Sequence, residues 1–206
     1  ISTNGFITFG TTAPSATGST TGYTPLSATT AYSGAASPIG RNLNAYFFTG
    51  NAAQTGEIRY QTLGSTPNRT FVIQFKNFKT FNTSGATFGP VLNFQVRLSE
   101  TSNAITFVYS CSGNFAVSTA QVGLRGANNA FPSNINNRSV VSSSNTWINS
   151  VTGTSNAATC EFSGSLLPPA GLTYTFAPAS CPAPLTPSAT NVTQNSAQLV
   201  WTSGGG

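Results

Sequence analysis

Side chains that commonly carry catalysis are scarce in this chain. Its 206 residues include no histidine and no aspartate, and the acidic residues are Glu57, Glu100 and Glu161. Triads that activate a serine or cysteine need an imidazole, and calcium sites need several closely spaced carboxylates. Two glutamates could form a glycosidase pair, but Glu57 precedes a predicted strand and Glu100 lies in a predicted polar turn. We expect both to be solvated side chains, and we predict that the chain is not an enzyme and binds no metal or cofactor.

The three cysteines, Cys111, Cys160 and Cys181, do not have the spacing of a metal site. Three thiolates alone would leave a zinc site incomplete. An odd count means that one thiol is free or pairs outside this segment. We predict a disulfide between Cys111 and Cys160, with Cys181 at a domain junction, free or paired elsewhere. Pairing of Cys160 with Cys181 stays open, because sequence alone does not determine connectivity.

Aromatic residues in predicted loops are the remaining candidates for ligand contact. They are Tyr23, Tyr32, Phe81 and Trp147. Their rings could stack on sugars, or they could cover the core instead. The long connections that would carry recognition are Thr11 to Gly40, Asn82 to Pro90 and Ala127 to Asn156. Loops on a rigid scaffold often bind ligands, but these loops could equally be solvated spacers.

Charged residues make up only 5% of the chain, against about a quarter in an average protein. The net charge of +5 reflects the scarcity of acids, because most arginines are scattered singly. Nucleic-acid binding needs a basic patch, and a membrane-spanning helix needs about 20 apolar residues, so we predict neither. Abundant Thr, Ser, Asn and Gly suit a secreted or surface-exposed β-protein. Low charge also leaves little repulsion between copies, so self-association is a further expectation.

The stretch from Thr70 to Tyr109 alternates between apolar and polar residues. Its apolar positions include Phe71, Ile73, Phe75, Ile105, Phe107 and Tyr109, and its polar positions include Gln74, Lys76, Asn93, Gln95 and Arg97. This alternation is typical of an antiparallel sheet with one face on the core and one in water. Further short strands are expected at 6–9, 44–48, 58–63, 120–125 and 172–176, and no segment of ten or more residues has a helical period. The sequence therefore predicts an all-β fold, an antiparallel β-sandwich of the jelly-roll or immunoglobulin-like kind.

Composition divides the chain into three parts. Residues 1–177 form the predicted sandwich, and their opening on an Asn4-Gly5 turn leads us to expect a missing upstream strand. Residues 178–184 form a Pro-rich linker, which should be stiff and extended. Residues 185–206 have the spacing of a strand, a turn and a second strand that carries Trp201. We expect the chain to be a fragment of a larger multidomain protein.

Residues 1–177 resemble the β-sandwich ectodomains of large secreted proteins from Bacteroidota and, more loosely, nidogen-like extracellular domains. The segments that carry the resemblance are 1–10, 58–62, 67–77, 93–98 and 120–124. Members of that group usually have an acidic pair where this chain has Asn44-Ala45-Tyr46, so an ion site that depended on those acids would lack its ligands. Residues 184–201 resemble the first two strands of a fibronectin type III module.

The resemblance implies export across the outer membrane to the cell surface, commonly by the type IX secretion system. Gliding adhesins and surface filaments of these bacteria are built from such modules. We therefore predict a non-catalytic, extracellular structural or adhesive module of a large cell-surface protein. Its expected partners are other modules of the same chain, copies of itself or other surface proteins. The alternative is a carbohydrate-binding module attached to a secreted enzyme, with a glycan as its ligand.

Overall fold

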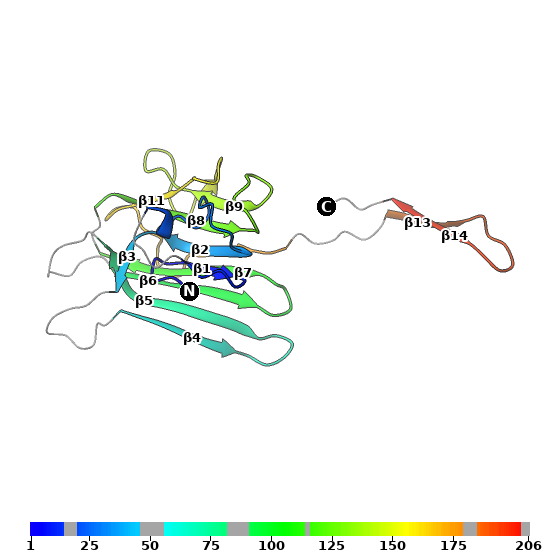
Figure 1. Ribbon diagram of the computed structural model, residues 1–206, viewed down its shortest axis with the longest axis horizontal. Helices are drawn as coiled ribbons and strands as arrows, with labels where there is room; N and C mark the ends of the chain where they lie inside the picture. Colours follow the sequence, from blue (N-terminus) through cyan, green and yellow to red (C-terminus); the bar gives the residue numbers. More distant parts are fainter. Residues whose placement is uncertain (15–19, 46–55, 82–90, 114–115, 179–184, 203–206) are drawn as a thin grey trace. The chain divides into compact units, whose positions relative to one another are not determined.

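The protein is all-β, and its strands belong to two compact units, Ile1–Phe176 and Ala177–Gly206. The computed structural model describes residues 1–14, 20–45, 56–81, 91–113, 116–178 and 185–202. The first unit contains two antiparallel sheets that face each other across one core (Figure 1). The predicted antiparallel β-sandwich is therefore confirmed.

One sheet, which we call the long sheet, is built around the stretch that alternates in sequence. Its strands are β3 (Leu43–Ala45), β4 (Glu57–Leu63), β5 (Thr70–Thr80), β6 (Val91–Ser99), β7 (Ile105–Ser112) and β12 (Thr173–Phe176). Their order is β12-β7-β6-β5-β3, and β4 also pairs with β5. The register places Phe75 opposite Phe94, and Phe94 opposite Tyr109, so apolar side chains from three strands share one face. The predicted alternation thus builds the core side of this sheet.

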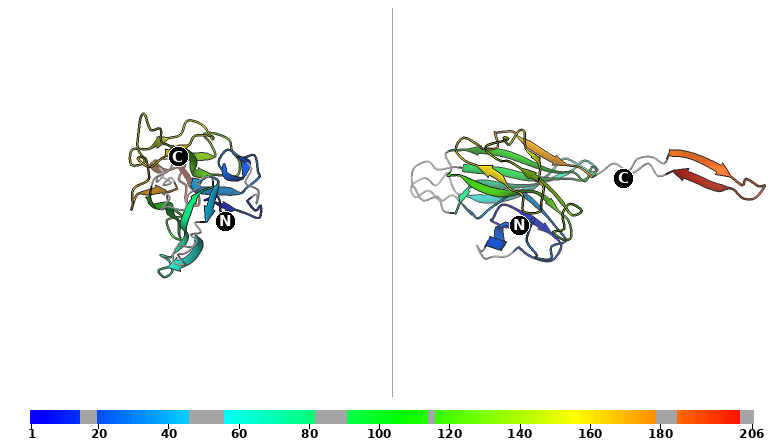
Figure 2. Two further views of the ribbon diagram at one scale, coloured as in Figure 1. Left: turned by 90° about the vertical axis from the view of Figure 1, so that its left-hand side faces the viewer. Right: turned by 90° about the horizontal axis from the view of Figure 1, so that it is seen from above.

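Strand β4 lies at the margin of the first unit. In Figure 1 and in the left view of Figure 2 this cyan strand lies at the lower edge of the unit. Only β5 pairs with it among the described strands. Ile58 packs against the core, but the rest of the strand from Arg59 on is exposed, and Tyr60 is 72% exposed.

The other sheet, which we call the second sheet, contains strands that the sequence did not reveal. Its strands are β1 (Ile7–Phe9), β2 (Gly34–Gly40), β8 (Ser118–Arg125), β9 (Ile135–Ser139), β10 (Val151–Thr152) and β11 (Cys160–Phe162). Their order is β1-β2-β8-β9-β10, and β11 also pairs with β8. The interpretation of 11–40 and 127–156 as surface connections is therefore wrong in part, because these ranges contain β2, β9 and β10.

Strand β2 escapes sequence analysis because its residues look like those of a loop. Its sequence is Gly-Ala-Ala-Ser-Pro-Ile-Gly, yet all seven residues are buried. Strands β1 and β8 flank β2 on both edges, and Ala36 and Ile39 pack into the core between the sheets. Pro38 is tolerated because a register shift interrupts the pairing with β8 between Ser37 and Gly40. A hydrogen bond from Tyr109 Oη to the Pro38 carbonyl (2.9 Å) then links the two sheets.

Aromatic side chains dominate the core between the sheets. Phe75 and Phe94 stack with their ring centroids 4.6 Å apart. Tyr109 contacts Trp147 and Tyr174 edge to face, at 5.5 and 5.6 Å. Such pairs add to the stabilisation that burial itself provides, so the core holds both sheets in a defined position.

In the described part of the second unit, β13 (Leu185–Thr190) and β14 (Gln198–Thr202) form an antiparallel hairpin. The strand, turn and strand expected for this segment are present. Apolar side chains of the hairpin, among them Val192, Leu199 and Trp201, are exposed. Assignment to a fibronectin type III module stays a prediction, as do the domain boundaries. Residues 179–184 of the predicted linker, and residues 46–48 of the strand expected at 44–48, lie outside the described residues.

Candidate functional site

The glutamates considered for catalysis are far apart and engaged in ion pairs. Glu57 accepts a hydrogen bond from Lys76 Nζ (3.1 Å) and lies 2.7 Å from an Arg59 guanidinium nitrogen. Glu100 binds the guanidinium of Arg69 through both carboxylate oxygens. Glu57 lies opposite Lys76, and Glu100 directly follows Ser99, the partner of Thr70. Lys76 and Thr70 are six residues apart on β5, so the two glutamates are separated by about 20 Å along the strand. The two carboxyl groups of a glycosidase lie only about 5–9.5 Å apart.

These contacts keep the carboxylates ionised. The hydrogen bond from Lys76 lowers the pKa of Glu57. Arg69 lowers the pKa of Glu100 to about 2. Hydrogen bonds from Ser142 lower the pKa of Glu161. A general acid needs the opposite shift, so none of the three glutamates is suited to donate a proton near neutral pH.

Within the ranges that the structure describes, no three His, Cys, Asp or Glu side chains come together to hold a metal ion. The same ranges contain no helix of the length and apolar character needed to cross a membrane.

Cys111 and Cys160 are both free thiols in the structure. The predicted disulfide between them is therefore not formed. Cys111 lies on β7 of the long sheet, with its Sγ 3.7 Å from the Asn93 carbonyl oxygen, and Cys160 is fully buried on β11 of the second sheet. Burial raises the pKa of each thiol to about 12. Cys181 lies outside the described residues, so its pairing stays a prediction.

Two of the four candidate aromatics belong to the core. Tyr32 is 3% exposed and Trp147 is 1% exposed. The Arg125 guanidinium lies 5.2 Å from the centroid of the Tyr32 ring, and Trp147 Nε1 donates to the Glu161 carbonyl (3.0 Å). Neither ring presents a face to solvent, so the interpretation of these aromatics as core cover is correct for both.

The other two candidates, Tyr23 and Phe81, lie together. Both line a small depression of about 180 Å³ that also includes Arg41 and Val117. The Arg41 guanidinium lies 5.5 Å from the Tyr23 ring centroid, and Phe81 is 54% exposed. The expected loop 82–90 that follows Phe81 lies outside the described residues.

A larger depression, of about 290 Å³, lies on the outer face of the long sheet. Its lining residues are Arg59, Tyr60, Gln61, Leu63, Val72, Gln74, Gln95 and Arg97. They come from β4, β5 and β6, the three neighbouring strands at the margin of the sheet. We call this surface the polar face.

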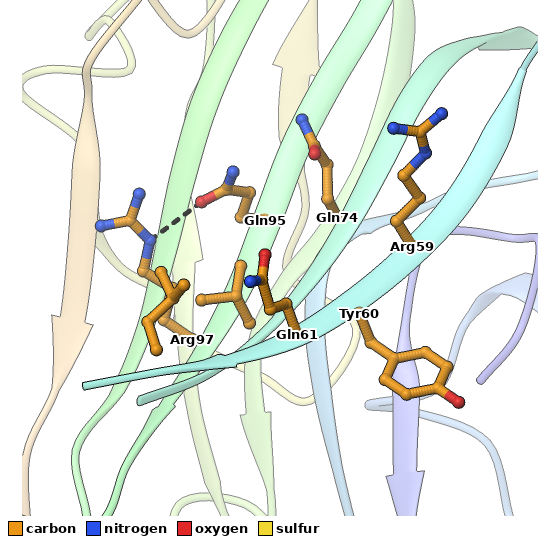
Figure 3. A pocket seen from close by; sticks show the side chains of 8 residues that line it. Arg59, Tyr60, Gln61, Gln74, Gln95 and Arg97 are labelled. Carbon is orange, nitrogen blue, oxygen red and sulfur yellow. Dashed lines mark hydrogen bonds between the residues drawn. The ribbon is translucent and has the colours of Figure 1, made fainter. Parts of the chain in front are cut away.

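Strand register explains how the polar face is arranged. Gln74 pairs with both Arg59 and Gln95, and Val72 pairs with both Gln61 and Arg97, giving two adjacent rows across the sheet. Figure 3 shows the guanidinium and carboxamide groups on one side of the strands, whereas the Tyr60 ring points away from them. Arg97 Nε donates to Gln95 Oε1 (2.9 Å). Buried Val72 forms an apolar floor between polar groups.

Sequence reasoning found only part of this surface. It placed Gln74, Gln95 and Arg97 outward, and the structure agrees. It did not associate Arg59 and Gln61 with them, because the pairing of β4 with β5 is not visible in the composition of either strand. The available signal was the alternation of Arg59 and Gln61 with Ile58 and Tyr60 along β4.

Comparison with known families gives one match. The family model described as NIDO related matches residues 1–178, which include the whole sandwich unit Ile1–Phe176. Neither a curated protein nor a solved structure matches the chain significantly. The match supports the nidogen-like part of the resemblance and leaves its Bacteroidota and fibronectin parts as predictions.

Proposed function

Because this chain belongs to the NIDO-related family, we propose that it is a non-catalytic structural or adhesive module of a large cell-surface protein. The observation that carries the proposal is that the family match covers the whole sandwich unit. A nidogen-related β-rich module fits an extracellular role of the adhesive kind. Other modules of the same protein, copies of the chain and other surface proteins are the proposed partners.

The chemistry of the chain supports a role without catalysis. The sequence has no histidine or aspartate, so the usual proton-transfer groups are missing. Each of its three glutamates is engaged by a neighbouring donor: Glu57 by Lys76, Glu100 by Arg69 and Glu161 by Ser142.

We further propose a cellular context for the parent protein. This proposal rests on the resemblance of residues 1–177 to Bacteroidota ectodomains and of residues 184–201 to a fibronectin type III module. It assigns the parent protein to the surface of a Bacteroidota cell, with export across the outer membrane by the type IX secretion system and a part in gliding or in surface filaments. The hairpin at 185–202, with its exposed Trp201, supports a following fibronectin type III module. Loss of the parent protein from the surface of a type IX secretion mutant is the expected result, and unchanged display would contradict this context.

Labelling of intact cells tests the main proposal. An antibody against residues 1–178 should stain unpermeabilised cells of the source organism, and deletion of the encoding segment should reduce attachment to a surface. Staining that appears only after permeabilisation would contradict the extracellular assignment. Normal attachment of a deletion strain that still displays the rest of the parent protein would contradict the adhesive role.

The alternative, a carbohydrate-binding module attached to a secreted enzyme, is favoured by one observation. Carboxamide and guanidinium groups are gathered on the polar face, and such groups can hydrogen-bond to sugar hydroxyls. Detection of a catalytic domain in the parent protein would support this alternative over the adhesive role.

A further inference from the structure

The polar face carries more positive than negative charge. Besides Arg59 and Arg97, the outer side of these strands includes Lys76 and Glu57, which lie opposite each other on β5 and β4. Glu57 pairs with both Lys76 and Arg59. Among the described residues no ion pair includes Arg97, which lies one row beyond that of Arg59 and two rows beyond that of Glu57 and Lys76. The face therefore offers a guanidinium whose charge no carboxylate compensates.

Arg97 is also held in a defined orientation. Its Nε donates to Gln95 Oε1 at 2.9 Å, while no described residue accepts from its terminal nitrogens. A planar guanidinium with free terminal donors matches a carboxylate through two parallel hydrogen bonds. The natural complement of this position is an anion with two oxygens in one plane.

The neighbouring carboxamides select for hydroxyl groups. Gln61 and Gln74 have no side-chain hydrogen bond to any residue in the described part of the chain. A carboxamide presents both donors and an acceptor, so it can bond to a hydroxyl in either direction. Leu63 and Val72, which line the same depression, supply apolar contact for carbon-bound hydrogens. A ligand that fits the whole surface thus combines carboxylates, hydroxyls and small apolar patches.

A second copy of the chain does not supply such an anion. The chain has only three acidic side chains, and each is already held by an arginine, a lysine or a backbone amide of its own surroundings. Charge complementarity therefore points to a partner of different chemistry.

We propose that the polar face binds an acidic polysaccharide, with a uronate carboxylate on Arg97 and sugar hydroxyls on Gln61, Gln74 and Gln95. The proposal rests on the adhesive function proposed above and names the ligand class of that module. Among the residues that the structure describes, no aromatic ring on this side of the strands is placed to stack on the sugar, because the Tyr60 ring points away (Figure 3). Binding is therefore polar, and it weakens as ionic strength rises.

Binding of the complete 206-residue chain to immobilised polygalacturonate, measured by biolayer interferometry, tests the proposal. Methyl-esterified polygalacturonate has the same backbone with its carboxylates capped, and it should bind at least about tenfold more weakly, since the charge-assisted bonds are lost. Polyglutamate supplies carboxylates without hydroxyls, and duplex DNA supplies phosphates. Both should bind more weakly than polygalacturonate. Equal binding of either one would overturn the proposal in favour of a general attraction for polyanions.

Variants locate the site. Arg97→Gln should weaken binding to polygalacturonate about tenfold or more, and Arg97→Lys should recover only part of it because an ammonium lacks the planar fork. Gln74→Ala, an independent change on the next strand, should weaken binding about threefold or more. Arg69→Gln is the matched control: it removes the same charge from a residue that lines a different depression, together with Phe71 and Leu98.

The outcomes separate this proposal from the function on which it rests. Equal effects of Arg97→Gln and Arg69→Gln, no effect of Gln74→Ala, or no binding of polygalacturonate by the wild-type chain would each overturn the polar-face assignment. If intact cells are labelled and adhesion depends on the module while polygalacturonate fails to bind, only the ligand class is wrong. If labelling requires permeabilisation, the extracellular function itself is wrong.

Discussion

Arg125 is a buried cation whose hydrogen bonds all go to backbone carbonyls. One terminal nitrogen donates to Pro25 (3.0 Å) and Ala28 (2.8 Å), and the other donates to Thr30 (2.6 Å). The Tyr32 ring packs against the guanidinium. Charged donors give stronger hydrogen bonds than neutral ones. This side chain therefore anchors residues 25–30, which form no strand, to β8.

Arg125→Ala should lower the free energy of unfolding by roughly 3 kcal/mol or more, because three carbonyls, two of them in buried contacts, lose their donor. Urea unfolding followed by tryptophan fluorescence measures this change. Arg59→Ala, which removes an exposed guanidinium, should change stability by less than about 0.5 kcal/mol. Similar losses for the two variants would show that the buried contacts do not stabilise the segment.

The thiols of Cys111 and Cys160 should resist alkylation in the native protein. Burial raises the pKa of both to about 12, and the thiolate is the reactive form. Iodoacetamide should therefore label neither residue under native conditions at neutral pH. Denaturant without reductant should expose both to labelling, as read by peptide mass spectrometry. Labelling that requires a reductant would restore the disulfide prediction.

Strand β8 is the central element of the second sheet, and Gly123 is its most restricted position. Its φ is +145°, and a Cβ atom there would lie 2.4 Å from the Asn136 carbonyl oxygen and 2.5 Å from Asn137 Cα. These contacts are with backbone atoms of the neighbouring strand β9, which cannot move aside without disrupting the pairing with β8.

Gly123→Ala should destabilise the protein by about 3–4 kcal/mol, from overpacking and backbone strain together. Gly171 provides the matched control, since its φ is also positive (+84°) but a Cβ atom would meet nothing within 4 Å. Gly171→Ala should lower the free energy of unfolding by only about 1–2 kcal/mol, which is the cost of holding a residue with a side chain at a positive φ. Thermal unfolding compares the two variants, and equal losses would mean that the close approach of β9 contributes nothing.

At the scale of the whole molecule, the unusual composition determines how stability depends on pH. The chain has no histidine, so no side chain with an unperturbed pKa titrates between about pH 5 and 8. All three glutamates have lowered pKa values in the folded state. Burial raises the pKa of Tyr174 to about 12, and it does the same for both described thiols.

Stability should therefore be flat from about pH 5 to 8 and fall on both sides. The contribution of Glu100 is fully present above the unfolded pKa of about 4.3, and it is lost as pH falls through the folded value of about 2. The contribution of the buried thiols is present below about pH 8.5, and it is lost as pH rises toward about 12.

Urea midpoints measured between pH 2 and pH 7 check the acid limb of this profile. Glu100→Gln should flatten it, because an amide does not titrate. An unchanged acid limb in Glu100→Gln would show that the ion pair with Arg69 does not stabilise the fold.

The sequence by itself determined the fold class and the long sheet. Strands β5, β6 and β7 follow one another along the chain and pair with their neighbours in sequence, so local alternation was enough to assign the core face and the outward positions of Gln74, Gln95 and Arg97. The scarcity of acids and the absence of histidine likewise limit the chemistry that the chain can perform, whichever way it folds.

The sequence indicated β1 and β8, but only the tertiary structure decided how the second sheet is completed and which residues make up the polar face. Strand β2 is buried because β1 and β8 flank its edges and its apolar residues pack on the core, and its small residues carry no alternating pattern that reveals this. Burial of Tyr32 and Trp147, and exposure of Phe81, depend on which distant segments cover each ring. Arg59 and Gln61 join the outward residues of β5 and β6 through the register of β4 with β5, and backbone pairing between segments leaves no local signature in the residues that it brings together.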